Sequence, residues 1–138
     1  MNAIEIKKGN SIGLLLTRCT IGILILFHGI ANMNSNYAFI KSLLVEKNLP
    51  DFLAYSVFIG EIIAPILIII GYKTRLSSLI IAINFLVAIL LAHSAEIFSL
   101  NQFGGWTLEL QAIYLFGSLA LFFTGAGEFS LSSISNKK

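Results

Sequence analysis

The sequence predicts an all-α integral membrane protein, a four-transmembrane-helix bundle with both termini in the cytoplasm. Of 138 residues, 57% are hydrophobic and only 12% are charged, whereas soluble domains average about 25% charged residues. Each of four apolar runs is long enough to cross a hydrocarbon core of about 30 Å as a helix. These runs cover about 11–30, 52–71, 76–93 and 106–124. We interpret residues 1–138 as a single membrane domain.

The residues outside the four runs, the single cysteine and the net charge narrow the prediction further. Residues 37–47 are amphipathic enough to form a short interfacial helix, and Pro50 with Asp51 is typical of a helix start. The N-terminus is too polar for a cleaved signal, so we expect the first run to be a retained span. The single cysteine, Cys19, excludes an intrachain disulfide and a CxxC redox pair. The net charge of +2 is too small to suggest a nucleic-acid partner.

The basic residues predict the orientation in the membrane. Six fall on one side of the expected bundle: Lys7, Lys8, Lys73, Arg75, Lys137 and Lys138. Only Lys41 and Lys47 fall on the other side. Because cytoplasmic loops carry the excess of basic residues, both termini are expected in the cytoplasm.

Two charged residues lie inside apolar runs. Glu61 is near the middle of the second run, where insertion of a carboxylate costs about 2.5–3.5 kcal/mol. Counting 1.5 Å per residue places Arg18 within about one helical turn of Glu61, which predicts an ion pair between them. This pair either fixes the helix register or forms the floor of a binding site. Asn84, half a turn out of phase with His93, is expected to bond another helix or a second protomer.

A second polar cluster is expected in the outer half of the bundle. His28 and His93 end two outward-running spans at similar height, and Glu109 enters the fourth span from the same surface. Glu96 lies in the loop nearby, so two imidazoles and one or two carboxylates can come together there. Imidazoles and carboxylates can exchange protons between water and a buried ligand, so His28, His93 and Glu109 are the candidate catalytic groups. Trp106 is typical of an interfacial anchor and lies near enough to contact a cofactor. No metal site is expected.

The ordered motifs resemble the DoxX family of small four-helix membrane proteins, related to the small subunit of thiosulfate:quinone oxidoreductase. The matching motifs are Arg18-x-x-x-Gly22, His28-Gly29, Glu61, Gly71-x-x-Thr74-Arg75, His93, Gly104-Gly105-Trp106-x-x-Glu109 and Thr124-Gly-Ala-Gly127-x-x-Ser130-Leu131. Family members often carry a lysine shortly after His-Gly, whereas that neighbourhood reads Ile30-Ala31-Asn32 in this chain. The resemblance implies membrane-associated redox or sulfur metabolism in the inner membrane of a bacterium, with quinone as the cofactor.

The sequence leaves several functions open. The first is a subunit of a quinone-linked oxidoreductase, in which Arg18, Glu61 and Trp106 would surround the cofactor and a separate redox partner would supply electrons. The second is a non-enzymatic scaffold that docks a soluble partner at the bilayer. A haem b protein with His28 and His93 as axial ligands, and a small proton-coupled transporter, are less favoured. A homo-oligomer is compatible with each of them.

Overall fold

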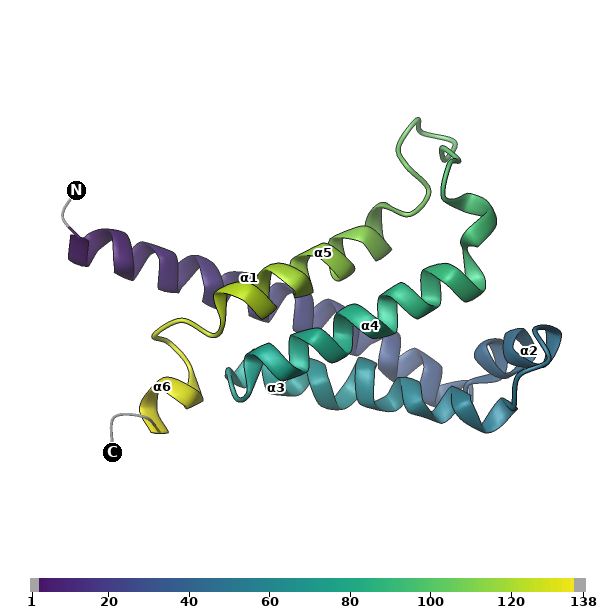
Figure 1. Cartoon of the computed structure of the whole chain (residues 1–138), viewed down its shortest axis with the longest axis horizontal. Coiled ribbons are helices and arrows are strands. Elements are labelled where there is room, and N and C mark those ends of the chain that lie inside the picture. Colours follow the sequence, from purple (N-terminus) through teal and green to yellow (C-terminus); the bar gives the residue numbers. More distant parts are fainter. Residues whose placement is uncertain (1–2, 136–138) are drawn as a thin grey trace.

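The computed structural model describes residues 3–135, and over these residues the prediction of an all-α fold is confirmed (Figure 1). Regular structure within this range is helical, apart from an isolated β-bridge between Leu100 and Trp106. The elements are α1 (Ala3–Asn34), α2 (Ala38–Glu46), η1 (Asp51–Ser56), η2 (Ile59–Ile63), α3 (Ala64–Ile70), α4 (Thr74–Ala92), η3 (Ser94–Glu96), α5 (Glu109–Thr124) and α6 (Leu131–Ser135).

Three helical segments of the described residues are long and apolar enough to cross a membrane: Lys7–Asn34, Asp51–Ile70 and Thr74–Ala92. The first extends the expected segment because α1 continues past its apolar run at both ends. The fourth apolar segment is shorter than predicted, since α5 begins at Glu109 and has 16 residues. At 1.5 Å per residue α5 spans about 24 Å, less than a typical hydrocarbon core.

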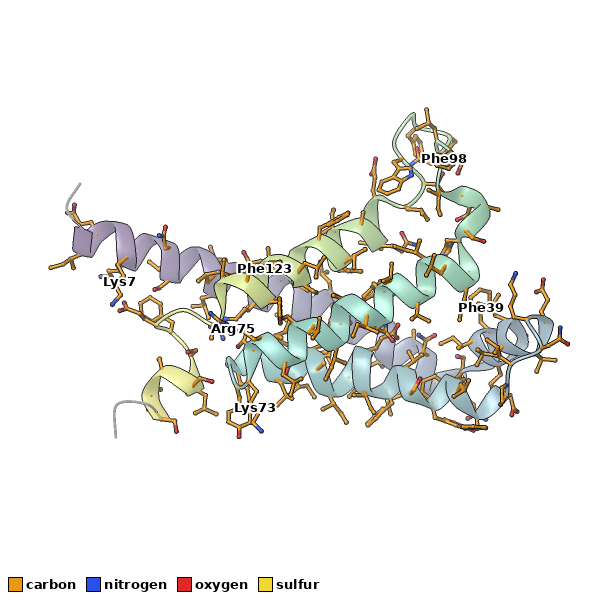
Figure 2. All side chains as sticks on the ribbon, viewed as in Figure 1. Lys7, Phe39, Lys73, Arg75, Phe98 and Phe123 are labelled. Carbon is orange, nitrogen blue, oxygen red and sulfur yellow. The ribbon has the colours of Figure 1, made fainter. Side chains whose placement is uncertain are left out.

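The bundle has two distinct ends. Both described ends of the chain and the α3–α4 turn lie at one end, which we call the terminal end (left in Figure 1). The other end, called the loop end, carries α2 and the segment between α4 and α5. Between them, buried side chains from α1, α3, α4 and α5 form one apolar core: Ile21, Ile25, Ala64, Ile68, Ile81, Phe85, Tyr114 and Leu121. Most of the remaining large apolar side chains point outward, as expected for helices in lipid (Figure 2).

The second apolar segment is not a uniform α-helix. It begins as the 3-10 helix η1, widens into the π-helix η2 and continues as α3. Pro65 has no backbone N–H, so the carbonyl of Glu61, four residues earlier, loses its usual α-helical donor. A single π turn accommodates this defect, and such turns are frequent at functional sites. Glu61 lies in this irregular turn.

Helix α2 closes the loop end of the bundle. Its Leu44 packs with Tyr37 and Ala54 in a small apolar cluster, which holds α2 against η1. Lys41 donates a hydrogen bond of 2.7 Å to the Tyr55 hydroxyl and also lies over its ring. Burial raises the pKa of the Tyr37 hydroxyl above its ordinary value, so this tyrosine stays neutral.

The C-terminal segment, residues 125–135, docks on the terminal end. Ser132 donates its backbone N–H to the Gly71 carbonyl at 3.1 Å. Arg18, fully buried, donates from Nη2 to the Phe129 carbonyl at 2.5 Å and from Nη1 to the Ile68 carbonyl at 3.2 Å. Gly71 is required there, because its φ is +73° and a Cβ would overlap Arg18 Nη1. Lys137 and Lys138, used in the charge count, lie outside the described residues.

The predicted ion pair between Arg18 and Glu61 is wrong. Within residues 3–135 their charged groups form no ion pair, because Glu61 lies beside Gly29 of α1. Gly29 is eleven residues beyond Arg18, or about 16 Å along the helix. The expectation took the apolar run as the whole helix, whereas α1 is 32 residues long. Helix register is decided by close contacts, which the apolar runs do not encode.

Replacing Arg18 with methionine is expected to release the C-terminal segment. The substitution leaves the Ile68 and Phe129 carbonyls without their charged donor, and such hydrogen bonds contribute roughly 1.5–3 kcal/mol each. Hydrogen exchange of the Ser132 amide should therefore rise by about tenfold or more. The His93 amide, which bonds to the Ile89 carbonyl at the loop end, is the internal control. Equal acceleration at both amides would mean that Arg18 stabilises the whole bundle instead.

Candidate functional site

A cavity of about 850 Å³ opens in the loop half of the bundle, bounded by α1, α2, the η1–η2 segment, α4 and α5. Its volume falls within the range of small-molecule sites, which are commonly about 300–1,000 Å³. Most of its wall is aliphatic or aromatic. The polar or titratable side chains on the wall are His28, Asn32, Ser56, Glu61, Asn84, His93, Gln111 and Tyr114. A mainly apolar pocket with a few convergent polar groups is the usual form of a cofactor site.

Glu61 is the centre of a hydrogen-bonded group formed by three segments. Asn32 of α1 donates to its Oε2 at 2.6 Å, and Asn84 of α4 donates to its Oε1 at 3.5 Å. The carboxylate is thereby held by two amides, with the residue only 8% exposed. Gly60 makes the Asn84 approach feasible, because a Cβ at Gly60 would lie 2.6 Å from the Asn84 Cγ. Small residues at such positions let helices approach closely.

His93 forms a second polar group on the cavity wall. Its Nδ1 lies 2.7 Å from a carboxylate oxygen of Glu96, and its Nε2 lies 3.5 Å from the Gln111 amide nitrogen. The sequence indicated that Asn84 and His93 could not face one site on a straight helix, yet both line the cavity. The reason is that α4 ends at Ala92, and His93 has φ of −126°, outside the helical range. The direction of the His93 side chain is therefore not set by the helix, and it can face the same cavity as Asn84.

His28 reaches the cavity from α1. Its ring packs edge-on against Tyr114, with ring centroids 5.8 Å apart, and Tyr114 in turn packs on Phe85 at 4.8 Å. One helical turn after His28, Asn32 points to the same side, which explains how α1 supplies two cavity groups. The structure thus brings His28, Glu61 and His93 to one cavity, as the sequence suggested for the two histidines.

Three candidate residues lie outside this cavity among the described residues. Arg18 is buried at the terminal end, where it holds the C-terminal segment. Trp106 donates its indole N–H to the Ile97 carbonyl at 2.8 Å, within the α4–α5 connection. Glu109 is exposed, and its carboxylate folds back over Gly105. Of the two carboxylates expected near His28 and His93, Glu96 contacts His93, whereas Glu109 is not part of the cluster and that part of the expectation is corrected.

Sequence reasoning missed Asn32, Gln111 and Tyr114 as cavity residues. A signal for Asn32 existed, because it follows His28 by four residues and so shares its helix face. Gln111 and Tyr114 carry a similar signal, being three residues apart near the start of α5. Their partners come from α1 and α4, and a single sequence does not specify which faces of separate helices meet.

The polar groups of the cavity supply complementary hydrogen-bonding roles. The amides of Asn32, Asn84 and Gln111 donate and accept, whereas an ionised Glu61 only accepts. Imidazole can donate from one nitrogen and accept at the other, and it changes charge near neutral pH. The set therefore suits a ligand that has oxygen acceptors or hydroxyl donors and exchanges protons.

Comparison with known proteins assigns the family. The family model described as DoxX matches residues 13–94, a stretch that contains His28, Glu61 and His93. No curated protein matches the chain, and no solved structure matches it either. The family match covers more than half of the sequence and agrees with the three long apolar helices. The chain therefore belongs to the DoxX family of membrane proteins.

Proposed function

We propose that this protein binds a membrane quinone in the 850 Å³ cavity and serves as the membrane component of a quinone-linked oxidoreductase system. The DoxX family is often linked to quinone-related oxidoreductase function. The observation that carries the proposal is the combination of apolar walls with the amide and carboxylate group around Glu61. A quinone has the matching chemistry, a polar ring with two carbonyl oxygens on a long apolar tail.

The residues on the cavity wall fit such a headgroup. Asn84 and Gln111 carry N–H donors for quinone carbonyls, and His28 offers a third donor in one of its tautomers. Glu61 accepts from a hydroxyl, which is the group that the reduced form presents. The aliphatic wall from α2 and α4 suits the first part of an isoprenoid tail.

Proton exchange is assigned to His93 together with Glu96. The Glu96 carboxylate, 2.7 Å from Nδ1, orients the imidazole ring. The side chain of His93 is 30% exposed while the residue also lines the cavity, so it can pass a proton between water and the site. A bound quinone would supply two-electron, two-proton redox chemistry, and the electrons would come from a separate protein or small molecule.

The proposal includes a topology of four crossings with both termini in the cytoplasm of a bacterium. Lys7, Lys8, Lys73 and Arg75 lie on the helix ends that form the terminal end, whereas Lys41 and Lys47 are at the loop end. This asymmetry favours a cytoplasmic terminal end under the positive-inside rule. The cavity then lies in the outer half of the inner membrane, beside the periplasm.

Filling the cavity is expected to displace the quinone. Ala88 lines the cavity, so Ala88→Phe should lower the quinone recovered per purified protein by about tenfold or more, because overfilling a packed site costs roughly 1–3 kcal/mol. Ala120→Phe is the matched control, since Ala120 is exposed on α5 away from the cavity. The measurement is chromatography of solvent-extracted lipid from each protein. Equal quinone in both variants, or none in the unmodified protein, would contradict the proposal and favour a scaffold.

A further inference from the structure

A second cavity lies at the terminal end, far along the bundle from the first. Its volume is about 460 Å³, and it is formed by the first residues of α4 together with the α5–α6 linker. Lys73, Thr74 and Arg75 line it from one side, and Gly125 and Ser132 line it from the other. Thr74 and Arg75 of the Gly71-x-x-Thr74-Arg75 motif therefore line this second cavity and not the proposed quinone site.

The start of α4 leaves backbone donors free at this cavity. The N-cap residue, Lys73, has φ of +44°, and no side chain caps the helix. The first intrahelical hydrogen bond runs from the Ser77 N–H to the Lys73 carbonyl. The N–H groups of the preceding turn point out of the helix end, where the helix dipole favours an anion.

Thr74 adds an unmet polar group at the same place. The residue is only 3% exposed, and its Oγ1 has no hydrogen-bond partner within the described part of the chain. Leaving a buried hydroxyl unpaired costs free energy, so such groups normally have a partner. Thr74 lines the cavity, so a ligand bound there can supply the missing acceptor once the buried hydroxyl turns toward it. The unpaired Thr74 hydroxyl is an observation independent of the helix dipole, and it also indicates a ligand with acceptor oxygens, such as an anion.

The charges around the cavity are of one sign. Lys73 and Arg75 are exposed and line it, whereas none of the described lining residues is acidic. The Arg75 guanidinium lies against Gly125, whose added Cβ would be 3.5 Å from Arg75 Nε. Gly125 has φ of +83°, a conformation that permits the linker to turn beside the arginine. The Lys73 ammonium lies over the Tyr72 ring, 5.7 Å from its centroid, and the two cations belong to residues on either side of Thr74 at the start of α4.

We propose that this cavity binds a phosphate-bearing anion between the start of α4 and the α5–α6 linker. Lys73 and Arg75 would neutralise its charge, the Thr74 Oγ1 would donate a hydrogen bond, and the first N–H groups of α4 would bind its oxygens. Helix α4 crosses the membrane from Thr74, so the cavity lies at the level of lipid headgroups. Basic pockets at this level recognise anionic lipid heads, although free phosphate offers the same chemistry. The site is independent of the quinone proposal.

Native mass spectrometry of the full chain in detergent tests the site and its ligand. Phosphatidylglycerol is expected to bind with a stoichiometry of one and to be retained where phosphatidylcholine with the same acyl chains is lost. Lys73→Gln combined with Arg75→Gln should weaken this binding roughly thirtyfold. Thr74→Val, which preserves shape and removes the hydroxyl, should weaken it roughly tenfold. Inorganic phosphate is titrated separately, with the thermal unfolding midpoint as the readout.

The control removes the same charge elsewhere, with Lys8→Gln combined with Lys47→Gln, and should bind the lipid as the unmodified protein does. Stabilisation by inorganic phosphate that the Lys73/Arg75 variant abolishes would also support the site, with free phosphate as the occupant. Equal retention of the two lipids without a phosphate effect would overturn the proposal. So would equal losses in the control, because a diffuse surface charge would then explain the binding. Helix content measured by circular dichroism confirms that each variant is folded.

Discussion

Gly29→Ala is expected to destabilise the bundle more than other single-methyl additions in α1, by about 2–3 kcal/mol. A Cβ at this position would overlap the Glu61 carbonyl oxygen and lie 2.9 Å from its carbonyl carbon. These are backbone atoms of the π-helix η2, so no side-chain rotation relieves the contact. The helices must separate, and the amide group around Glu61 separates with them. A lower thermal unfolding midpoint, measured by circular dichroism in detergent, is the expected result.

Gly13→Ala is the matched control on the same helix. Nothing lies within 4 Å of a Cβ added at Gly13, so only helix propensity changes. Alanine is better than glycine in a helix interior by about 1 kcal/mol, so this variant should be as stable as the unmodified protein or more stable. If both variants melt at the same temperature, the close approach of α1 to η2 does not limit stability. Retained quinone in Gly29→Ala would point to the same conclusion.

Glu61→Gln is expected to weaken hydroquinone binding by roughly ten- to a hundredfold, because a hydrogen bond to a charged group contributes about 1.5–3 kcal/mol. The substitution keeps the size and shape of the side chain. The amides of Asn32 and Asn84 can each rotate to present oxygen or nitrogen, so the glutamine can regain their hydrogen bonds. What it does not regain is a charged acceptor for a ligand hydroxyl. We therefore expect lost affinity with little change in the thermal unfolding midpoint.

The comparison variant for this experiment is Glu109→Gln, the same chemical change at an exposed residue outside the cavity. Its hydroquinone affinity should equal that of the unmodified protein in a titration with the purified, lipid-stripped chain. Oxidised quinone, which has no hydroxyl on its ring, should lose less affinity in Glu61→Gln than hydroquinone does. An unfolded Glu61→Gln protein would show that the carboxylate is structural. A larger loss in Glu109→Gln would restore the cluster first predicted from the sequence.

Much of the fold can be predicted from local patterns in the sequence. The apolar runs are local and long, so the segments that became α1, the η1–α3 segment, α4 and α5 were all predicted, as was the short helix α2. Boundaries were less accurate, because a helix can continue past its apolar run into polar sequence, as α1 does on both sides. The short helix α6 was missed, since its order comes from contacts with Gly71 and Arg18 and not from its own residues.

The candidate site was predicted in part. His28, Glu61 and His93 were identified as candidates because each is a titratable residue within an apolar run. Burying such a group in a membrane is costly, which makes a functional or structural role expected. Their partners were predicted only in part. Glu61 was paired with Arg18, whereas the structure gives it Asn32 and Asn84. Of the two carboxylates expected near His93, Glu96 contacts it and Glu109 does not.

The sequence by itself determined that this is a helical membrane protein of the DoxX type with costly polar groups inside the bundle. Composition and run length are sufficient for the membrane helices, because the bilayer imposes the same requirement on every segment, whereas the DoxX resemblance rests on the ordered motifs. Only the tertiary structure decided which residues meet. Gly29 and Gly60 let backbone and amide groups approach within van der Waals contact of η2, and these contacts set the height of Glu61. If one helix shifts along its neighbour by a few residues, the length of the apolar run inside the membrane is unchanged. Every partner of a buried polar group, however, is replaced by another residue.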